Sequence, residues 1–378
     1  MGGVHRIAFI RWGRFSHVNR NVLEHLRLNF PRGRVDVVDL SELKLQARDK
    51  LQLFRSSAAS EYGQQALSSK AALDRYAKRT AFFFQYVKEG LAKILSGRKY
   101  SCTIQTQSLF DAGQRGIPHF VYTDHTHLAN LYYPGFDRAQ LFSPAWIDLE
   151  KTIYRNAAMN FTMSSHVSRS LVEHYQCSPD RIQCVYVGSN IRIPADREPS
   201  DPRYAGKEIL FVGGDWERKG GPLLARAYAQ VIKKVPAAKL TIVGCRPALD
   251  LPNCRVLGRL PLARLAAHYQ RASLFCMPTQ VEPFGIAVLE ALAHRLPVVS
   301  TRIGALPDMV EHGVSGYLVD PTDADALARY LVTLLGSPAR CRQFGKAGFA
   351  RMRERYTWKA TGERIARTMK ALVPASGR

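Results

Sequence analysis

The sequence predicts an α/β protein built from two doubly wound domains that face each other across a cleft. Three observations point to this fold. Short apolar runs of strand formers alternate with helical segments, the alternation is interrupted at a polar stretch (189–207) rich in proline, serine and charge, and it then restarts. Strands that alternate with helices favour parallel sheets covered by helices on both faces. The length of 378 residues suits two or three such domains.

The first half opens with a strand at 5–10, and a loop with a single glycine, Gly13, leads to a helix at 21–30. A second strand is expected at 34–40, because this short run is rich in valine, a β-branched residue, and begins with a charged residue. Residues 44–99 have a helical pattern. Further strands are expected at 101–107, 119–127, 159–165 and 182–188, and helices at 149–157 and 166–175.

The second half repeats the alternation after the linker candidate at 189–207. Strands are expected at 208–214, 238–245, 254–258, 273–278 and 297–301, and helices at 222–235, 262–272, 285–294 and 324–336. Ligands of such sheets bind beyond the carboxyl ends of the strands.

The formal charge of +23 is the most unusual compositional feature, and it is spread over both halves. Such an excess attracts nucleic acid, acidic lipid surfaces or phosphorylated substrates, although a GC-rich proteome that favours arginine explains it equally well. Residues 44–99 hold twelve Lys and Arg against four Asp and Glu. This segment is a candidate for docking on an anionic membrane surface, but solvated helix faces have the same pattern.

The seven cysteines are scattered and form no C-x-x-C pair, which favours a reduced, cytoplasmic chain. No apolar stretch is long enough to span a membrane, and the N-terminus leads directly into a strand rather than a signal peptide. We therefore expect a cytoplasmic protein, peripheral at the inner membrane face if the basic segment docks there.

A glutamate in an apolar helix marks the candidate site. Glu290 is the only polar residue of the helical run 286–293, and Glu282 lies just before the helix begins. The helix is expected to be buried all round, so an ionised Glu290 costs several kcal/mol unless it has a partner. That partner is either an arginine of the protein or a ligand. Glu282 is either a ligand contact or an ordinary acid at a helix start.

The C-terminal half resembles the family-4 glycosyltransferases of group 1 type over about residues 207–360. The motifs "FVGGDWERKGG", "TIVG", "VLGRL", "PFGIAVLEALAHRLPVVST", "GALPDMVEHGVSGYLVDPTD" and "YTWKA" occur in the family's order. The resemblance implies the GT-B fold, with two Rossmann-like domains, and transfer of a sugar with retention of anomeric configuration. It is weak over residues 1–190.

The resemblance also implies roles for the E-x₇-E element. Glu290 would hydrogen-bond the ribose hydroxyls of a nucleotide-diphosphate-sugar, and Glu282 would contact hydroxyls of the donor sugar. The backbone around Gly285 and Ile286 would meet the phosphates, because a helix N-terminus favours anions. The same resemblance places Phe284, Gly214 and Leu260 in the donor pocket.

Two cations are expected on the loop "GDWERKGG". Lys219 matches a family lysine that neutralises the donor diphosphate as the glycosidic bond breaks. The family's arginine position is Gly214 in this chain, so Arg218 is the candidate for the second cation. A solvated, charged turn is the alternative.

In the first half, His125 matches a family histidine that contacts the donor sugar, with His127 as the second candidate. The H-x-H spacing also fits a metal pair, but no third ligand is nearby. Gly13 would let the backbone approach the phosphates, or it lies in a plain turn. Asp323 and Asp325 form a D-x-D, a metal motif in other glycosyltransferases, but acids at a helix start explain it better.

These observations predict a metal-independent, retaining glycosyltransferase that needs no cofactor beyond its nucleotide-diphosphate-sugar co-substrate. Residues 1–190, with a C-terminal crossing helix at 356–378, would bind the acceptor, which is an unknown glycan, lipid-linked or small molecule. Residues 191–355 would bind the donor. The alternatives are a GT-B nucleotide-sugar epimerase and a nucleic-acid-binding protein, although no RNP-like signature supports the latter.

Overall fold

The computed structural model describes residues 6–43, 45–189 and 201–373. The chain divides into two compact units. Unit 1 comprises Met1–Leu131, Gly135–Val187 and Trp358–Arg378, and unit 2 comprises Tyr132–Pro134 and Gly188–Thr357. Residues 190–200 of the expected linker lie outside the described residues.

Unit 1 is built on a six-stranded parallel sheet in the order β2-β1-β3-β4-β5-β6. The strands are β1 (Arg6–Arg11), β2 (Arg34–Asp39), β3 (Cys102–Thr106), β4 (His119–Thr123), β5 (Met159–Thr162) and β6 (Ile182–Cys184). The strand order reverses between β1 and β3, which is the switch point where ligands of such sheets bind.

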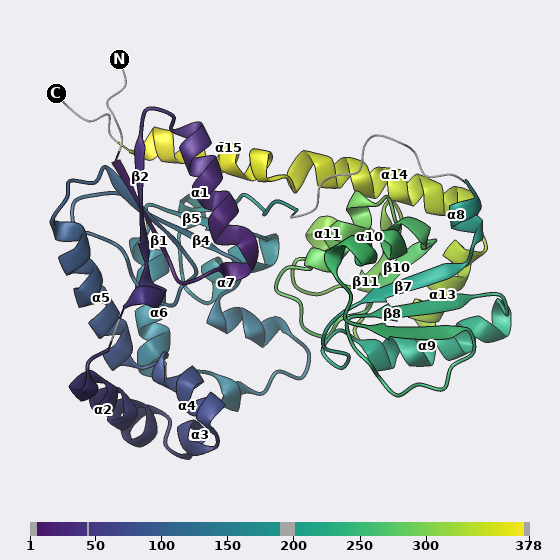
Figure 1. The fold of residues 1–378 in the computed structure, drawn as a ribbon, viewed down its shortest axis with the longest axis horizontal. Coiled ribbons are helices and arrows are strands. Elements are labelled where there is room, and N and C mark those ends of the chain that lie inside the picture. The colour runs from purple at the N-terminus through teal and green to yellow at the C-terminus, as the bar shows by residue number, and fades with distance from the viewer. Residues whose placement is uncertain (1–5, 44, 190–200, 374–378) are drawn as a thin grey trace. The chain divides into compact units, whose positions relative to one another are not determined.

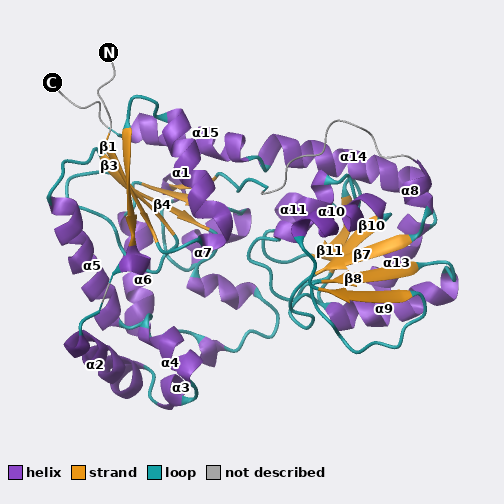
Figure 2. Cartoon of the chain, in the orientation of Figure 1, coloured by secondary structure: helices purple, strands orange, loops and turns teal. Residues whose placement is uncertain are grey.

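Unit 2 is built on a second six-stranded parallel sheet, in the order β12-β11-β10-β7-β8-β9. Figure 2 labels β11, β10, β7 and β8 of this sheet. The strands are β7 (Glu208–Val212), β8 (Lys239–Val243), β9 (Cys254–Gly258), β10 (Leu274–Met277), β11 (Val298–Thr301) and β12 (Gly316–Val319). Counted from β7, this is the 3-2-1-4-5-6 order of dinucleotide-binding sheets, and its switch point lies between β7 and β10.

Helices cover both faces of each sheet, as expected for parallel strands that are buried on both sides. Those of unit 1 are α1 (Val18–Asn29), α2 (Ala47–Arg55), α3 (Gln64–Leu67), α4 (Lys70–Ala77), α5 (Ala81–Ser96), α6 (Pro144–Asn156), α7 (Ser165–Glu173) and α15 (Trp358–Leu372), with a π-helix, η3 (Ser56–Glu61). Those of unit 2 are α8 (Asp201–Ala205), α9 (Gly221–Lys234), α10 (Leu262–Arg271), α11 (Ile286–Ala293), α12 (Leu306–Met309), α13 (Ala324–Leu335) and α14 (Pro338–Arg355).

In unit 1, helices α5, α6 and α7 share one apolar core, with fully buried Ile153 and Leu171 among its members. The last helix, α15, packs against α1 (Figure 1). Gly362 permits this approach, because a Cβ at that position would lie 2.5 Å from the His25 side chain. In unit 2, α9 packs with α13 and α11 packs with α14.

The structure confirms the alternating α/β pattern, including all eleven strands expected from the sequence. It adds β12, for which no element is predicted above. It also adds α14, and it shows α8 within the expected linker. Helix α8 forms because Arg203 donates to the carbonyls of Tyr269, Ala272 and His294, while the buried Tyr204 donates to the Arg295 carbonyl.

One expectation about burial is wrong. Helix α11 is not buried all round, because Ile286 is 39% exposed and Glu290 is partly exposed. Helix α11 is therefore open at its start and along one face.

Candidate functional site

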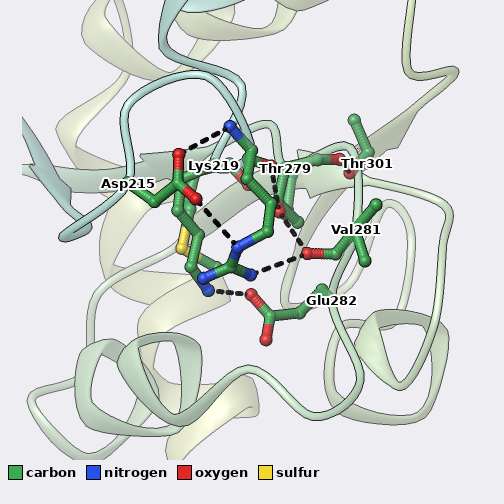
Figure 3. Close-up of polar contacts among 9 residues, drawn as sticks. Asp215, Lys219, Thr279, Val281, Glu282 and Thr301 are labelled. Carbon is green, nitrogen blue, oxygen red and sulfur yellow. Dashed lines mark hydrogen bonds and ion pairs between the residues drawn. The ribbon is translucent and has the colours of Figure 1, made fainter. Parts of the chain in front are cut away.

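The candidate site lies at the carboxyl ends of neighbouring strands in unit 2. Loops after β7, β10 and β11 meet there, on either side of the switch point between β7 and β10. Thr301 Oγ1 ties the β11 end to the β10 loop by donating to the Thr279 carbonyl at 2.6 Å (Figure 3). This is the edge at which such sheets bind ligands.

The loop after β7 is a compact turn organised by Asp215. Its carboxylate accepts from the Arg218 backbone N–H at 3.1 Å, and its carbonyl accepts from the Lys219 N–H at 3.0 Å. The turn ends at Gly220, whose φ is +76° and where a Cβ would lie 1.7 Å from the Pro278 carbonyl oxygen. Only glycine allows the β7 loop to approach the β10 loop this closely.

This close approach brings Lys219 and Glu282 together. The Lys219 ammonium donates to the Glu282 carboxylate (Figure 3), and the two side chains are 14% and 6% exposed. Removing one partner of such a buried pair leaves an uncompensated charge. Glu282 therefore does not act as a simple acid at a helix start, because its partner is a cation from the neighbouring loop.

Arg218 joins the same two loops. Its guanidinium donates to Asp215 Oδ2 at 3.3 Å and to the Val281 carbonyl at 3.1 Å, and its own carbonyl accepts from Thr279 Oγ1 at 2.9 Å. About two fifths of the side chain is exposed. Arg218 thus holds the backbone next to Glu282 in place, and its guanidinium remains accessible.

The partner of Glu290 is neither an arginine nor a lysine in the described part of the chain. Its carboxylate accepts from the Tyr269 hydroxyl of α10 at 2.9 Å. Burial raises the pKa of Glu290, and the Tyr269 hydrogen bond offsets part of that effect. Tyr269 is 1% exposed and holds the carboxylate from the protein interior, whereas Glu290 itself is partly exposed. One neutral donor leaves most of its acceptor capacity unused.

The N-terminus of α11 begins at Gly285, whose φ is +97°, and the described residues supply no side-chain cap for it. The first N–H groups of the helix are therefore available to an anion. The preceding Phe284 is buried and anchors this turn, and Ile286 is exposed beside it. At Gly304 the β11 loop passes so close that a Cβ would lie 1.8 Å from the Glu282 carbonyl oxygen.

The remaining donor-pocket candidates, Gly214, Leu260 and Gly13, lie in three different loops. Gly214 is exposed at the end of β7, and a Cβ there would meet nothing within 4 Å. Leu260 is half-buried between β9 and α10. Gly13 lies in unit 1 with a φ of +61°, and its N–H donates to Asp39 Oδ1 at 3.0 Å. The Gly13 amide is thus already used within unit 1, and its phosphate contact stays a prediction.

The two candidate histidines, His125 and His127, have different surroundings in unit 1. His127 is buried and stacked on Phe142, with ring centroids 4.1 Å apart, and its Nε2 accepts from the Phe142 N–H at 2.8 Å. Burial lowers the pKa of His127 to about 3, so it is a neutral structural residue. His125 pairs through Nε2 with Asn130 Oδ1 at 3.2 Å, and Asn130 in turn donates to the His127 carbonyl. Of the two, His125 is the candidate for a ligand contact, and that role stays a prediction.

The D-x-D sequence belongs to a helix start. Asp323 Oδ1 accepts from the Ala326 N–H at 2.8 Å and caps α13, while Asp325 accepts from Gln230. In the described ranges no group of three His, Cys, Asp or Glu side chains is arranged to hold a metal.

The sequence analysis does not predict three residues of this site. Tyr269, Asp215 and Thr279 hold Glu290, the β7 turn and the β10 loop respectively. The sequence does contain a signal for Asp215. An acid three residues before Arg218 in a glycine-rich turn favours a side-chain hydrogen bond to a backbone N–H of that turn. No local pattern indicates Tyr269, because it lies on a different helix from Glu290.

A family model and curated relatives match part of this chain. Residues 206–337 match the family model for group 1 glycosyl transferases. The D-inositol 3-phosphate glycosyltransferase of Segniliparus rotundus is 30% identical over 226 residues, which are 54% of this chain and 50% of that protein. The corresponding enzyme of Thermobispora bispora is 33% identical over 53% of this chain and 52% of that protein. The chain thus spans about half the length of these curated relatives.

Solved structures are similar over almost the whole chain. Sucrose-phosphate synthase from Thermosynechococcus elongatus has a TM-score of 0.69 at 19% identity, and the match covers 97% of this chain and 99% of that one. HepE from Anabaena, solved with UDP and glucose, has a TM-score of 0.62 at 14% identity, with 97% and 99% coverage. These similarities confirm the GT-B fold.

Proposed function

We propose that this chain, which carries a group 1 glycosyltransferase domain at residues 206–337 on a GT-B fold, transfers a sugar from a nucleotide-diphosphate-sugar to an acceptor. Unit 2 would bind the donor, and unit 1, with α15, would bind the acceptor. The acceptor is a glycan, a lipid-linked molecule or a small molecule.

The observation that carries the proposal is the meeting of Lys219 and Glu282 at the switch point, beside the uncapped start of α11. A diphosphate at this edge would accept from Lys219 and from the first N–H groups of the helix. The sugar beyond it would donate hydroxyls to Glu282. The open carboxylate of Glu290 suits a ribose, whose two hydroxyls can donate to its two oxygens.

The same groups support chemistry without a metal ion. Charge develops on the diphosphate as the glycosidic bond breaks, and preorganised donors stabilise it most in that transition state. A front-face route, in which the leaving phosphate helps to deprotonate the acceptor, would retain the anomeric configuration. This route requires no carboxylate nucleophile.

The test begins with binding, because any donor that binds the folded state raises the unfolding temperature. A panel of nucleoside diphosphates and their sugar conjugates should include at least one that stabilises the protein. With that donor, turnover to the nucleoside diphosphate should require an acceptor and persist in EDTA. Loss of activity in EDTA that Mg²⁺ or Mn²⁺ restores would reject the metal-free mechanism.

The same assays separate the rival functions. Donor turnover without any acceptor would favour a nucleotide-sugar epimerase. Salt-sensitive oligonucleotide binding, together with indifference to every nucleotide-sugar, would favour a nucleic-acid-binding protein.

We also propose that the basic segment docks unit 1 on an anionic membrane. On α2, Leu51 and Phe54 are 52% and 45% exposed beside the exposed cations Arg48, Lys50 and Arg55. In the described residues no helix is long and apolar enough to cross a membrane. Vesicles with phosphatidylserine should bind the protein in low salt, and Phe54→Ser should weaken that binding. Equal binding to neutral and anionic vesicles would contradict the proposal.

A further inference from the structure

The sheet of unit 1 ends at β2, which pairs with β1 on one side only. With six residues, β2 is longer than the other edge strands of the two described sheets, which are β6, β9 and β12. Its register with β1 runs without a bulge over Arg34–Asp39. In the described residues no backbone group bonds to the outer side of β2, so a row of N–H and C=O groups is open there.

Proteins protect such edges with free charges, prolines or bulges, and β2 has little of this protection. Its charged side chains are paired within the chain. Asp36 pairs with Arg6 at 2.8 Å and with Arg34 at 2.9 Å, and Asp39 pairs with Arg11 at 2.9 Å. Because these charges already have partners, they present little net charge to an approaching strand.

A groove of about 420 Å³ lies along this edge, between β2 and the end of α5. Val37, Leu43 and Ile94 contribute apolar groups to its lining. Val37 is 37% exposed and Ile94 is 48% exposed. Open strand backbone beside exposed apolar side chains is the kind of surface that an added strand covers.

The charges at the two ends of β2 decide what can be added. Arg32 precedes the strand and Glu42 follows it, and each lies five positions from Val37. Both are exposed, and neither forms an ion pair with a described residue. An antiparallel copy of the same strand, centred on Val37, would bring its Glu42 beside Arg32 and its Arg32 beside Glu42. The edge is therefore complementary to itself under a two-fold axis.

The register follows from the side chains at the centre. Centring the pair on Asp36 would place two carboxylates opposite each other, which is unfavourable. Centring it on Val37 makes the two exposed valines neighbours. A two-fold axis normal to the sheet keeps both α5 helices on one face, so the Ile94 side chains flank the axis on that face.

We infer that this chain forms a two-fold dimer through its β2 edges, with the two six-stranded sheets joined antiparallel into one. Val37 packs against Val37 of the second copy, and the Arg32 and Glu42 charges pair across both ends of the contact. The dimer does not depend on the proposed function, because it uses the edge of unit 1 and no residue of the candidate site.

Sedimentation equilibrium of the full chain tests the dimer. It is measured at physiological ionic strength, because the charge of +23 opposes association in low salt. The average mass should rise with concentration from that of one chain towards that of two. Val37→Lys places two ammonium groups opposite each other and should weaken association about tenfold or more. The matched control is Val172→Lys, at a valine of α7 that is 40% exposed, which should leave association unchanged.

Cross-linking tests the register. Residues opposite each other in an antiparallel pair have Cα atoms about 4.5–5.5 Å apart, within the range of a disulfide. Val37→Cys should therefore give a disulfide-linked dimer on a non-reducing gel after mild oxidation. In the same register the Cα atoms of residue 38 lie more than about 7 Å apart, so Val38→Cys should give none. Val172→Cys controls for random collision and should also give none.

Charge reversal tests the ends of the contact. Arg32→Glu and Glu42→Arg should each weaken the dimer several-fold, because each places like charges together. The double variant should recover most of the wild-type association, since the pair forms again with its signs exchanged. A chain that is monomeric at every concentration would overturn the inference. So would a dimer that Val37→Lys does not weaken, or cross-linking of Val38→Cys in place of Val37→Cys.

Discussion

Lys219 and Glu282 neutralise each other across the switch point of the second sheet. The pair has a direct consequence for ligand binding. A diphosphate that takes the Lys219 ammonium must share it with Glu282 or displace it, and a sugar that uses Glu282 must do the same. The two residues expected to bind different parts of the donor are therefore coupled.

This coupling predicts opposite effects of two substitutions. Glu282→Gln removes the competing charge, so a nucleoside diphosphate without a sugar should bind several-fold more tightly while donor turnover falls. Lys219→Met should weaken diphosphate binding and lower kcat by about a hundredfold, or roughly 3 kcal/mol. Calorimetry and steady-state kinetics measure both effects.

The double variant supplies the control. In the Lys219→Met background, Glu282→Gln should change diphosphate affinity by a different factor than in the wild type, because the two residues are in direct contact and their effects are not additive. Unchanged turnover in Lys219→Met would refute the assignment of this lysine to the diphosphate.

Arg218 and Gly214 test where the second cation comes from. Arg218→Ala should weaken donor binding, whereas the unfolding free energy should fall by less than about 1 kcal/mol because the Asp215 pair is exposed. Gly214→Arg restores the family's arginine at a position where a Cβ meets nothing within 4 Å. It should therefore recover donor affinity in the Arg218→Ala background, as measured by calorimetry. If Arg218→Ala binds donor normally, the second cation lies elsewhere.

The raised pKa of the buried Glu150 predicts that the stability of the protein depends on pH. Burial raises its pKa from 4.5 to about 7, although Tyr175, Ser108 and the His127 N–H all donate to it. The folded state therefore binds a proton more tightly than the unfolded state. The stabilising contribution is full below pH 4.5 and is lost as the pH rises through 7.

Glu150→Gln removes this dependence. Relative to the wild type, the variant should gain up to about 3 kcal/mol of stability between pH 4.5 and pH 8. Urea unfolding at several pH values measures the gain. A constant difference across that range would show that Glu150 does not titrate there.

The sequence predicted the strands well because each is a short apolar run bounded by polar residues, as in 208–212 and 298–301. It predicted Glu290 and Lys219 as site residues from their motifs, but it could not pair Lys219 with Glu282, which are 63 positions apart. Helix α11 shows that composition alone does not predict how far a helix is buried. Its apolar residues predict complete burial, yet its exposure depends on what the rest of the fold leaves uncovered.

Donor affinity of Glu290→Gln, measured by calorimetry beside Glu208→Gln, tests the central claim most directly. Glu208 is a structural glutamate of the same unit, paired with Arg271 and Thr241, so its substitution should lower the unfolding temperature and leave donor affinity unchanged. Glu290→Gln should remain at least as stable as the wild type, because burial raises the pKa of Glu290 and thus disfavours its charge. Its affinity for the nucleotide-sugar should fall at least tenfold, since bonds to a charged acceptor are worth about 1.5–3 kcal/mol. Normal donor binding by Glu290→Gln would contradict the account, because Glu290 would then be a structural residue and not the donor contact.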